Sequence, residues 1–394
     1  MCRRLSRKSA WFKMNNNSRK IVFVNQATGY LTIDIINEFA NEFDQVALIA
    51  GSVRVQDVKL DESVKWVKIT RYNRGNPFKK FISWVWGTVQ IFFLILFRFR
   101  SYEVFYVTVP PTAYLLSLVL HNRFSIQVAD VYPDALKIFG IRDKNPIYKA
   151  WQNWNKKLFA QTHRIFTLGE AMRNVLSQYI SPEQVYVVNN WSGLTNLQPV
   201  AKENNPFVAN HSLEGKFIVE YSGNIGHTHN VETLINVAEL LKNNETILFL
   251  VIGRGNRLQV IKQLIHEKKL HNCILLPFQP DDMIKYSLSA ADLSVVILDE
   301  RVSGNSIPSK TYNLLAVGSP LLVIGSDNAE MAGFVREHEI GRSFSRNHDV
   351  EMAEYILSLQ NDHTLLSSMS SNALQAAGKF TSRNARLYLQ HYMA

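Results

Sequence analysis

The stretch SIPSKTYNLLAVGSPLLVI, residues 306–324, contains the pattern of a loop, a helix and a strand in immediate succession. Its polar loop ends in Ser309 and Lys310, an apolar helical segment follows, and the strand begins at Leu321. A polar loop that leads into a helix directs free backbone N–H groups and the positive end of the helix dipole to one place, and Lys310 adds a full charge there. The stretch therefore predicts a phosphate site. The alternative is an ordinary loop-helix-strand unit of an α/β domain with a solvated lysine.

The composition is that of a globular protein with two or three domains. The chain has 394 residues, of which 46% are hydrophobic and 19% are charged. This length and apolar content are enough for more than one hydrophobic core. Its two cysteines, Cys2 and Cys273, lie far apart without a CxxC pair, which favours a reducing compartment and predicts no structural zinc. The basic start is followed by asparagines instead of an apolar run, so we expect no secretory signal, and Met14 is an alternative start to Met1.

Positive charge is concentrated in the first half of the chain. Residues 1–200 carry 26 lysines and arginines against 13 aspartates and glutamates, whereas residues 201–394 carry 17 against 20. A basic surface attracts nucleic acid or an anionic membrane, and each cation near a membrane contributes on the order of 1 kcal/mol. No nucleic-acid-binding module is recognisable and the aromatic residues are massed in one run, so we expect an anionic membrane surface as partner and no nucleic acid.

Short apolar strands alternate with helical segments along the first half. The first strand, Ile21–Asn25, precedes a loop at residues 26–30 and a helix expected over residues 31–43. Further strands are expected at Val46–Ala50, Val64–Ile69, Val104–Val107, Ser125–Val128, His163–Leu168 and Val185–Val188. This pattern predicts a parallel sheet, in which ligands bind beyond the carboxyl ends of the strands. Gly29 in the first loop would let a ligand approach the backbone, although turn geometry explains a glycine there equally well.

The segment VADVYPDAL, residues 128–136, places a carboxylate where one of these strands ends. Asp130 at a strand's carboxyl end faces the expected crevice, where it is a candidate to act on a substrate hydroxyl. A role as a helix N-cap or in a turn is the alternative.

The segment FISWVWGTVQIFFLILF, residues 81–97, is the most apolar run in the chain. Four cations flank it: Lys79, Lys80, Arg98 and Arg100. The run is short for a membrane-spanning helix and contains polar residues. Three interpretations stay open, namely a buried core helix, a helix lying in the membrane interface and a true span. Trp84, Trp86 and the flanking cations are the features that favour the interface.

The second half repeats the strand-helix pattern. Gly223 and Gly226 follow the strand expected at Phe217–Tyr221, and two glycines there make a tight turn that directs N–H groups toward a phosphate. The strand expected at Ile247–Ile252 ends in Gly253, Arg254 and Gly255, and the strand expected at residues 274–276 ends next to Phe278. Because the carboxyl ends of parallel strands meet at one edge of a sheet, these residues predict a binding crevice.

Four segments of the second half occur together in an order and spacing that resemble a known family. They are YSGNIGHTHNVE (residues 221–232), VIGRG (251–255), LPFQPDDMIKYSLSAADLSVV (276–296) and PSKTYNLLAVGSPLL (308–322). The chain resembles the retaining glycosyltransferases of family 4, in particular the bacterial exopolysaccharide and lipopolysaccharide enzymes. In the first half, VADVYPDAL and the passage from residue 165 to residue 191 are also similar to the family. The ordered set is specific, whereas no single motif is.

The resemblance implies an α/β protein of the GT-B fold, with two Rossmann-like domains whose parallel sheets face a central cleft. We expect a basic tail at residues 1–20, an N-terminal acceptor-binding domain at 21–195, a linker at 196–212, a nucleotide-sugar-binding domain at 213–372, and a C-terminal helix at 373–394 that packs back on the N-terminal domain. The linker is assigned from its polar, proline-containing composition.

The resemblance also implies a nucleotide diphosphate-sugar donor, with UDP as the expected nucleotide, and a lipid-diphosphate-linked glycan acceptor. The residues that match the family's positions are Gly223, Asn224 and Gly226 near the diphosphate or the sugar, Gly253, Gly255, Ser309 and Asn313 around the donor, Arg254 and Lys310 against the leaving diphosphate, Phe278 beside the base, and Gly29 and Asp130 toward the acceptor. Fixed cations can stabilise a diphosphate leaving group without a metal. No Asp-x-Asp pair is present, and we expect neither a metal nor a cofactor.

Two departures from the family pattern stand out. Many members carry two glutamates where this chain has Asn305 and Asn313, and an amide forms a weaker hydrogen bond to a ribose hydroxyl than a carboxylate does. The arginine and lysine that many members place after the first glycine turn are replaced by residues 227–229, which are His-Thr-His. Arg254 and Lys310 should therefore supply more of the charge that stabilises the leaving diphosphate, or turnover should be lower.

The sequence predicts a cytoplasmic glycosyltransferase bound peripherally to the inner face of the plasma membrane. Two other classes stay open, because fold alone does not determine function. A sugar-nucleotide epimerase of the same fold would convert its donor without an acceptor, and a silent subunit of a polysaccharide assembly complex would turn over no donor.

Overall fold

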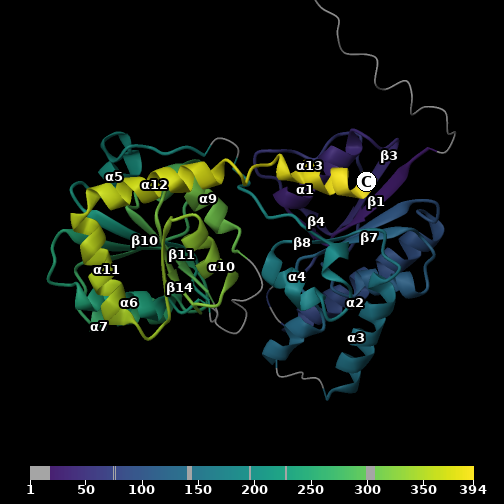
Figure 1. The fold of residues 1–394 in the computed structure, drawn as a ribbon, viewed down its shortest axis with the longest axis horizontal. Coiled ribbons are helices and arrows are strands. Elements are labelled where there is room, and N and C mark those ends of the chain that lie inside the picture. Colours follow the sequence, from purple (N-terminus) through teal and green to yellow (C-terminus); the bar gives the residue numbers. More distant parts are fainter. Residues whose placement is uncertain are drawn as a thin grey trace, which may run out of the picture. The chain divides into compact units, whose positions relative to one another are not determined.

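The computed structural model describes residues 18–73, 75, 77–139, 144–194, 197–226, 229–298 and 307–394. The chain divides into two compact units (Figure 1). The first unit consists of Met1–Tyr132, Ala150–Phe166 and Tyr388–Ala394, and the second of Pro133–Lys149 and Thr167–Leu387. Both candidate starts, Met1 and Met14, lie outside the described residues, as do most of the predicted basic tail, Asn305 and the first two residues of the His-Thr-His segment.

The first sheet has seven strands in the order β5-β3-β1-β6-β7-β8-β9. The strands are β1 (Lys20–Val24), β3 (Gln45–Ala50), β5 (Lys65–Lys68), β6 (Glu103–Val107), β7 (Phe124–Val128), β8 (Ile165–Thr167) and β9 (Val185–Val187), and a small separate pair joins β2 (Ala27–Thr28) to β4 (Ser52–Val53). The pairs β5–β3, β3–β1, β1–β6 and β6–β7 are parallel. Parallel neighbours need crossover connections, and the amphipathic segments between the strands supply them. The predicted parallel sheet is therefore confirmed.

The helices that accompany this sheet lie between its strands in the sequence. They are α1 (Tyr30–Ala40), α2 (Pro77–Phe97), α3 (Pro146–Phe159) and α4 (Glu170–Leu176), with short 3-10 helices η1 (Ala113–Leu118), η2 (Asp134–Phe139) and η3 (Pro182–Gln184). Helix α1 ends at Ala40, earlier than the predicted end at residue 43. Aromatic rings fill the core against it, because Phe23 lies 5.2 Å from Phe39 and 4.9 Å from Phe105 between ring centroids.

The second sheet has six strands in the order β12-β11-β10-β13-β14-β15, and all neighbouring pairs are parallel. The strands are β10 (Phe217–Asn224), β11 (Ile247–Arg254), β12 (Cys273–Leu276), β13 (Leu293–Ile297), β14 (Leu321–Ile324) and β15 (Gly341–Phe344). Both faces of such a sheet are covered by helices, which explains why its strands are almost continuously apolar.

Helices surround the second sheet in Figure 1. They are α5 (Pro206–Asn210), α6 (Val231–Leu240), α7 (Leu258–Glu267), α8 (Ile284–Ser289), α9 (Lys310–Ala316), α10 (Glu330–Glu337), α11 (Asp349–Asn361) and α12 (His363–Ala377), with η4 (Lys202–Asn204) and η5 (Asp281–Met283). Side chains alternate between the two faces along β10. Val219 and Tyr221 pack in one core with α6 and α11, while Ile218 packs in another with α5.

Strands β10 and β11 are longer than predicted. They were expected to end at Tyr221 and Ile252, but they continue to Asn224 and Arg254 in a parallel register that pairs these two residues. The glycine-containing segments that the sequence suggested as turns are therefore partly strand. The reason is that glycines at matching positions let the two backbones pair one step further.

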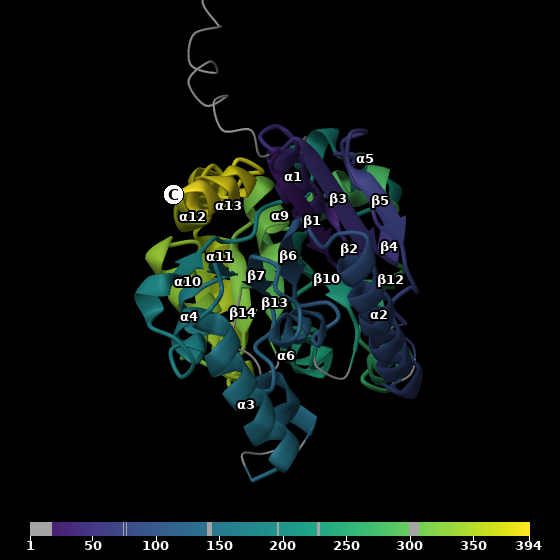
Figure 2. The ribbon, with the colours of Figure 1, turned by 90° about the vertical axis from the view of Figure 1, so that its right-hand side faces the viewer.

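Helix α2 does not have the environment of a core helix. Figure 2 shows the course of this long helix. Only 22% of its most apolar stretch is buried, and the helix is long and apolar enough to cross a membrane by length and composition. One face packs inward through Ser83, Ile91 and Ile95. The other faces expose large apolar side chains: Phe78, Phe81, Ile82, Val85, Trp86, Val89, Phe93 and Phe97. The core interpretation is therefore wrong. The interfacial and spanning interpretations stay predictions.

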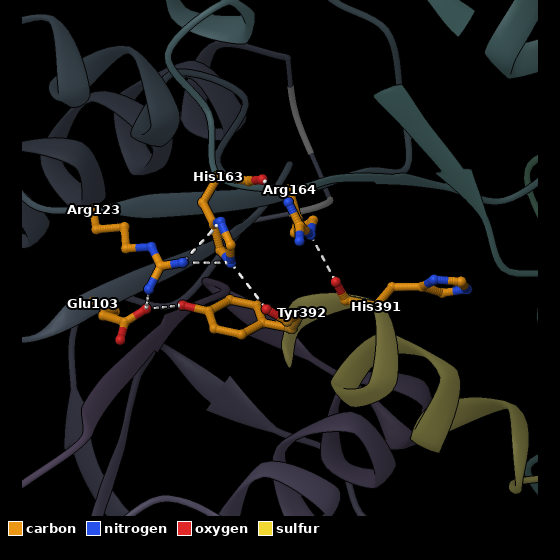
Figure 3. Close-up of polar contacts among 6 residues, drawn as sticks. All are labelled: Glu103, Arg123, His163, Arg164, His391 and Tyr392. Atoms are coloured by element: carbon orange, nitrogen blue, oxygen red, sulfur yellow. Dashed lines mark hydrogen bonds and ion pairs between the residues drawn. The ribbon is translucent and has the colours of Figure 1, made fainter. Parts of the chain in front are cut away.

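The last helix, α13 (Asn384–Met393), packs against the first sheet. Figure 3 shows Tyr392 of α13 donating a hydrogen bond from its hydroxyl to Glu103, while Arg164 donates from Nε to the carbonyl oxygen of His391 at 2.7 Å. Gln127 of β7 also donates to the hydroxyl of Tyr388 at 2.7 Å. These bonds and the buried tyrosine rings hold the end of the chain in the first unit. The segment expected as one helix over residues 373–394 is instead divided between α12 and α13.

Candidate active site

The centre of the candidate site lies where β10 and β11 end side by side. Gly223 and Gly253 are paired in the parallel register. A Cβ on Gly253 would lie 2.0 Å from the carbonyl oxygen of Gly223, and one on Gly255 would lie 2.1 Å from that of Ile225. Gly255 also has a φ of +157°, which favours glycine. Gly253 and Gly255 are thus required by close contact between backbones, whatever they contribute to a ligand.

The other two glycines are under weaker constraints. A Cβ on Gly223 would meet its nearest neighbours, Lys310 Nζ and the Tyr221 hydroxyl, at 3.4 Å, which is ordinary contact. A Cβ on Gly226 would come within 2.7 Å of the amide nitrogen of Asn224, an exposed side chain that can move. Close backbone contact therefore does not require a glycine at either position, and the ligand role that the resemblance implies for them stays a prediction.

Lys310, the first residue of α9, brings its ammonium group to the end of β10. Its Nζ lies 4.3 Å from the centroid of the Tyr221 ring. The nitrogen is buried and has no hydrogen-bond partner among the described residues. Burial lowers the pKa of Lys310 to about 8, and the nearby charge of Glu220 acts in the opposite direction. A buried cation without an acceptor is costly. The arrangement is therefore suited to receiving an anion.

Glu220 on β10 is the residue of this site that the sequence analysis missed. It is 1% exposed, and neither carboxyl oxygen has a hydrogen-bond partner among the described residues. Burial raises the pKa of Glu220 well above its usual range, and the charge of Lys310 opposes that shift. The sequence did contain a sign of this residue, namely a glutamate inside the apolar strand segment FIVEY. A charged side chain in such a strand is buried, so it needs an oppositely charged or hydrogen-bonding neighbour.

Arg254 and Phe278 come together at the ends of neighbouring strands. The guanidinium carbon of Arg254 lies 5.0 Å from the centroid of the Phe278 ring, and Phe278 is 44% exposed. An exposed aromatic face with a cation beside it can stack on a planar base and contact a phosphate. The predicted grouping of these two residues is present in the structure.

The predicted loop residue Ser309 and the helix residue Asn313 flank Lys310 on α9. Ser309 is the N-cap residue without a side-chain cap bond, and α9 has seven residues. The dipole of such a short helix is weak. Most of the positive charge expected at the start of α9 therefore comes from Lys310. Asn313 accepts a hydrogen bond from the Ser192 hydroxyl at 2.8 Å. Its amide nitrogen can still donate to a ligand hydroxyl.

The two predicted acceptor residues, Gly29 and Asp130, belong to the first unit. Gly29 is the N-cap of α1, and a Cβ there would meet nothing within 4 Å. Asp130 is exposed, and its carboxylate accepts no hydrogen bond from the described residues, so it is not an N-cap. Although part of the residue is exposed, surrounding protein atoms desolvate the carboxyl group and raise the pKa of Asp130, whereas the charge of Lys80 lowers it.

No group of three or more His, Cys, Asp and Glu side chains that could hold a metal ion occurs in the described part of the chain. The expectation of chemistry without a metal or cofactor stays a prediction.

The chain is similar to known proteins, most specifically over part of the second unit. A family model described as "Glycosyl transferases group 1" matches residues 202–376, a range that contains every predicted donor-site residue. A relative in Pseudomonas aeruginosa, "Probable glycosyltransferase WbjE", is 26% identical over 348 residues, which cover 84% of this chain and 85% of the relative.

Solved structures show the same fold over nearly the whole chain. HepE of Anabaena in complex with UDP has a TM-score of 0.71 at 12% identity and covers 95% of this chain and 99% of its own. WaaG, a glycosyltransferase involved in lipopolysaccharide biosynthesis, has a TM-score of 0.69 at 13% identity and covers 93% and 98%. Residues 202–376 match the group 1 family of glycosyl transferases, and the chain is a glycosyltransferase with the GT-B fold.

Proposed function

We propose that this glycosyltransferase moves a sugar from a nucleotide diphosphate-sugar, with UDP as the nucleotide, to a lipid-diphosphate-linked acceptor in cell-surface polysaccharide synthesis. The observation that carries the proposal is the buried ammonium group of Lys310 beside Gly223, which has no hydrogen-bond partner in the part of the chain that the structure describes. Support comes from HepE, which was solved with UDP, and from WaaG, which is involved in lipopolysaccharide biosynthesis. Retention of configuration is part of the proposal, and the resemblance to family 4 supports it.

The donor site would act mainly on the leaving diphosphate. As the bond between the anomeric carbon and the diphosphate oxygen breaks, negative charge grows on the diphosphate and the sugar gains oxocarbenium character. Lys310 would stabilise that growing negative charge from a buried position, and Arg254 would add a second cation while Phe278 borders the base. Asn313 would hold a ribose hydroxyl through its amide nitrogen.

Asp130 would act on the acceptor. It is an exposed carboxylate with no hydrogen-bond partner among the described residues, and a raised pKa makes the ionised form a stronger base. It would accept a hydrogen bond from the acceptor hydroxyl and draw its proton away as that oxygen attacks.

A nucleotide panel tests the donor site. We expect UDP to stabilise the wild-type protein against heat more than GDP, ADP or dTDP do, by about 2.7 kcal/mol at a hundredfold excess over Kd. The effect should be much smaller in Lys310→Met, because the variant lacks the cation that holds the diphosphate. Absence of a shift with every nucleotide, or an equal UDP shift in the variant, would contradict the proposal. Conversion of a UDP-sugar to its epimer without an acceptor would indicate an epimerase instead.

We also propose that the protein binds peripherally to the cytoplasmic face of the plasma membrane through α2. The helix exposes eight large apolar side chains, with the exposed cations Lys79, Arg98 and Arg100 at its ends. This combination fits insertion of aromatic residues between acidic lipid headgroups.

Replacing both Trp86 and Phe93 by serine should release the protein from vesicles made of equal parts phosphatidylcholine and phosphatidylglycerol. These side chains are 55% and 51% exposed, and full burial of each in the membrane contributes roughly 1.5–3 kcal/mol, so we expect vesicle binding to weaken by about tenfold or more. Leu240→Ser, at a 51% exposed apolar residue of α6, is the matched control. Unchanged sedimentation of the double variant would contradict the interfacial role.

A further inference from the structure

A cluster of partly exposed aromatic side chains lies in the first unit between α2 and the loops that follow β5 and β7. Trp84 of α2 stacks on Tyr72, with ring centroids 6.1 Å apart and planes 7° apart. Tyr132 meets the edge of Trp84 at 6.3 Å and stacks on the buried Trp151 at 5.7 Å. Trp84 therefore belongs to this cluster and not to the exposed apolar face of α2, where the sequence analysis had placed it with Trp86.

A cation, an indole N–H group and a carboxylate lie beside these rings. The ammonium group of Lys80, one turn before Trp84, lies 4.8 Å from the Trp84 ring and 5.9 Å from the Tyr72 ring. The indole nitrogen of Trp84 is buried and donates to no acceptor among the described residues. The carboxylate of Asp130 interacts electrostatically with Lys80 and Tyr132 and is exposed. A cation, an N–H donor and a carboxylate thus border one aromatic surface.

A buried glutamine, Gln26, connects the two segments that carry Tyr72 and Trp84. Gln26 donates from Nε2 to the carbonyl oxygen of Thr70 at 3.0 Å and to that of Ser83 at 2.7 Å. It thereby ties the end of β5, just before Tyr72, to the helix that carries Trp84. Gly87 leaves room for this amide, because a Cβ there would lie 2.5 Å from Nε2. The aromatic surface is held in place before any ligand arrives.

We propose that Tyr72, Lys80, Trp84, Asp130 and Tyr132 form a subsite for the sugar-phosphate head of the acceptor. One face of a pyranose ring is a set of apolar C–H groups that can cover an aromatic ring, while its hydroxyls need acceptors such as a carboxylate. The adjoining phosphate is an acceptor for the ammonium group of Lys80 and the indole N–H. This inference rests on the proposed function, since it names the chemistry of the acceptor that the transferase would use.

The place of the cluster on α2 agrees with a lipid-linked acceptor. The same helix exposes an apolar face on its other sides. If that face enters the membrane, Lys80 and Trp84 lie at the depth of the headgroups, where the sugar and phosphate of a lipid-linked acceptor are found.

Binding of short-chain probes to the full-length protein, without donor and without vesicles, tests the subsite. The probes are decyl-diphospho-hexoses, with decyl diphosphate and hexose 1-phosphates as comparisons, measured by titration calorimetry below the micelle concentration. We expect Lys80→Gln and Trp84→Leu each to weaken binding of the best decyl-diphospho-hexose about tenfold. Lys157→Gln removes an exposed charge from α3 in the same unit and should leave binding unchanged.

The outcomes separate the subsite from simpler explanations. Tighter binding of the decyl-diphospho-hexose than of hexose 1-phosphate assigns the head of a lipid-linked acceptor, and equal binding assigns a soluble sugar phosphate. Three results would overturn the inference. The first is equal weakening by Lys80→Gln and Lys157→Gln, and the second is equal binding of decyl diphosphate and the hexose probes to the wild-type protein. The third is no binding of any probe. If Trp84→Leu fails to fold, Lys80→Gln decides alone. The UDP shift is measured on the same samples, so a failed donor site is recognised separately.

Discussion

Replacing Lys310 by methionine is expected to lower kcat by about two to three orders of magnitude while the protein stays folded. Methionine keeps an unbranched side chain of similar length and removes only the charge that would stabilise the leaving diphosphate. The ammonium group is buried without a hydrogen-bond partner among the described residues, and such a group destabilises the folded state. The melting temperature of the variant should therefore stay the same or rise.

The matched control is Lys262→Met, which removes an exposed lysine from α7 in the same unit. Its kcat should equal that of the wild type. Near-normal turnover in Lys310→Met would show that Lys310 does not stabilise the leaving diphosphate. A loss of activity that parallels a fall in melting temperature would show a structural role instead.

The same lysine should set the basic limb of the pH profile. Burial lowers the pKa of Lys310 to about 8, so the cation is present below that pH and is lost as the pH rises through it. The value of kcat/KM should therefore fall above about pH 8, and the limb of kcat should lie higher, because bound diphosphate favours the cation. Glu220→Gln removes the charge that opposes the shift, so it should move the kcat/KM limb to lower pH. If the basic limb of kcat/KM has the same pH midpoint in Glu220→Gln as in the wild type, the charges of Lys310 and Glu220 are not coupled.

Gly253→Ala is expected to disrupt the centre of the donor site and to destabilise the protein. The new Cβ would lie 2.0 Å from the carbonyl oxygen of Gly223, so β10 and β11 must move apart where their ends are paired. Overpacking costs about 1–3 kcal/mol and occasionally more, and for a unit of this size it should lower the melting temperature by about 5–10 °C. Stabilisation by UDP should be lost at the same time, since the end of β10 faces Lys310.

Gly223→Ala is the informative comparison for Gly253→Ala. Its Cβ would make only ordinary contacts of 3.4 Å with Lys310 and Tyr221, so the melting temperature should change little. Donor affinity should nevertheless fall, because the methyl group takes space beside the ammonium group. Equal melting temperatures for Gly253→Ala and the wild type would show that the strands are not packed as described.

Much of this molecule follows from local sequence patterns. The apolar runs gave nearly every strand, because residues buried between two layers of helices must be apolar, and their alternation with helices gave the parallel sheets. The order of the glycine segments, Phe278 and the Lys310 segment predicted which strand ends carry the site, since parallel strands present those ends at one edge. The GT-B fold and the glycosyltransferase class were implied by the resemblance of the four ordered segments to a known family.

Only the tertiary structure decided what surrounds each of these groups. The sequence could not show that the Lys310 ammonium is buried over Tyr221 and coupled to Glu220, because solvation depends on neighbours from distant segments. Hydropathy likewise could not distinguish a covered from an uncovered α2, since both have the same composition. The roles of Gly253 and Gly255 changed as well, because a glycine required by an adjacent backbone looks identical in sequence to one that leaves room for a phosphate. Sequence determines which groups are available, and packing determines which of them are left without partners.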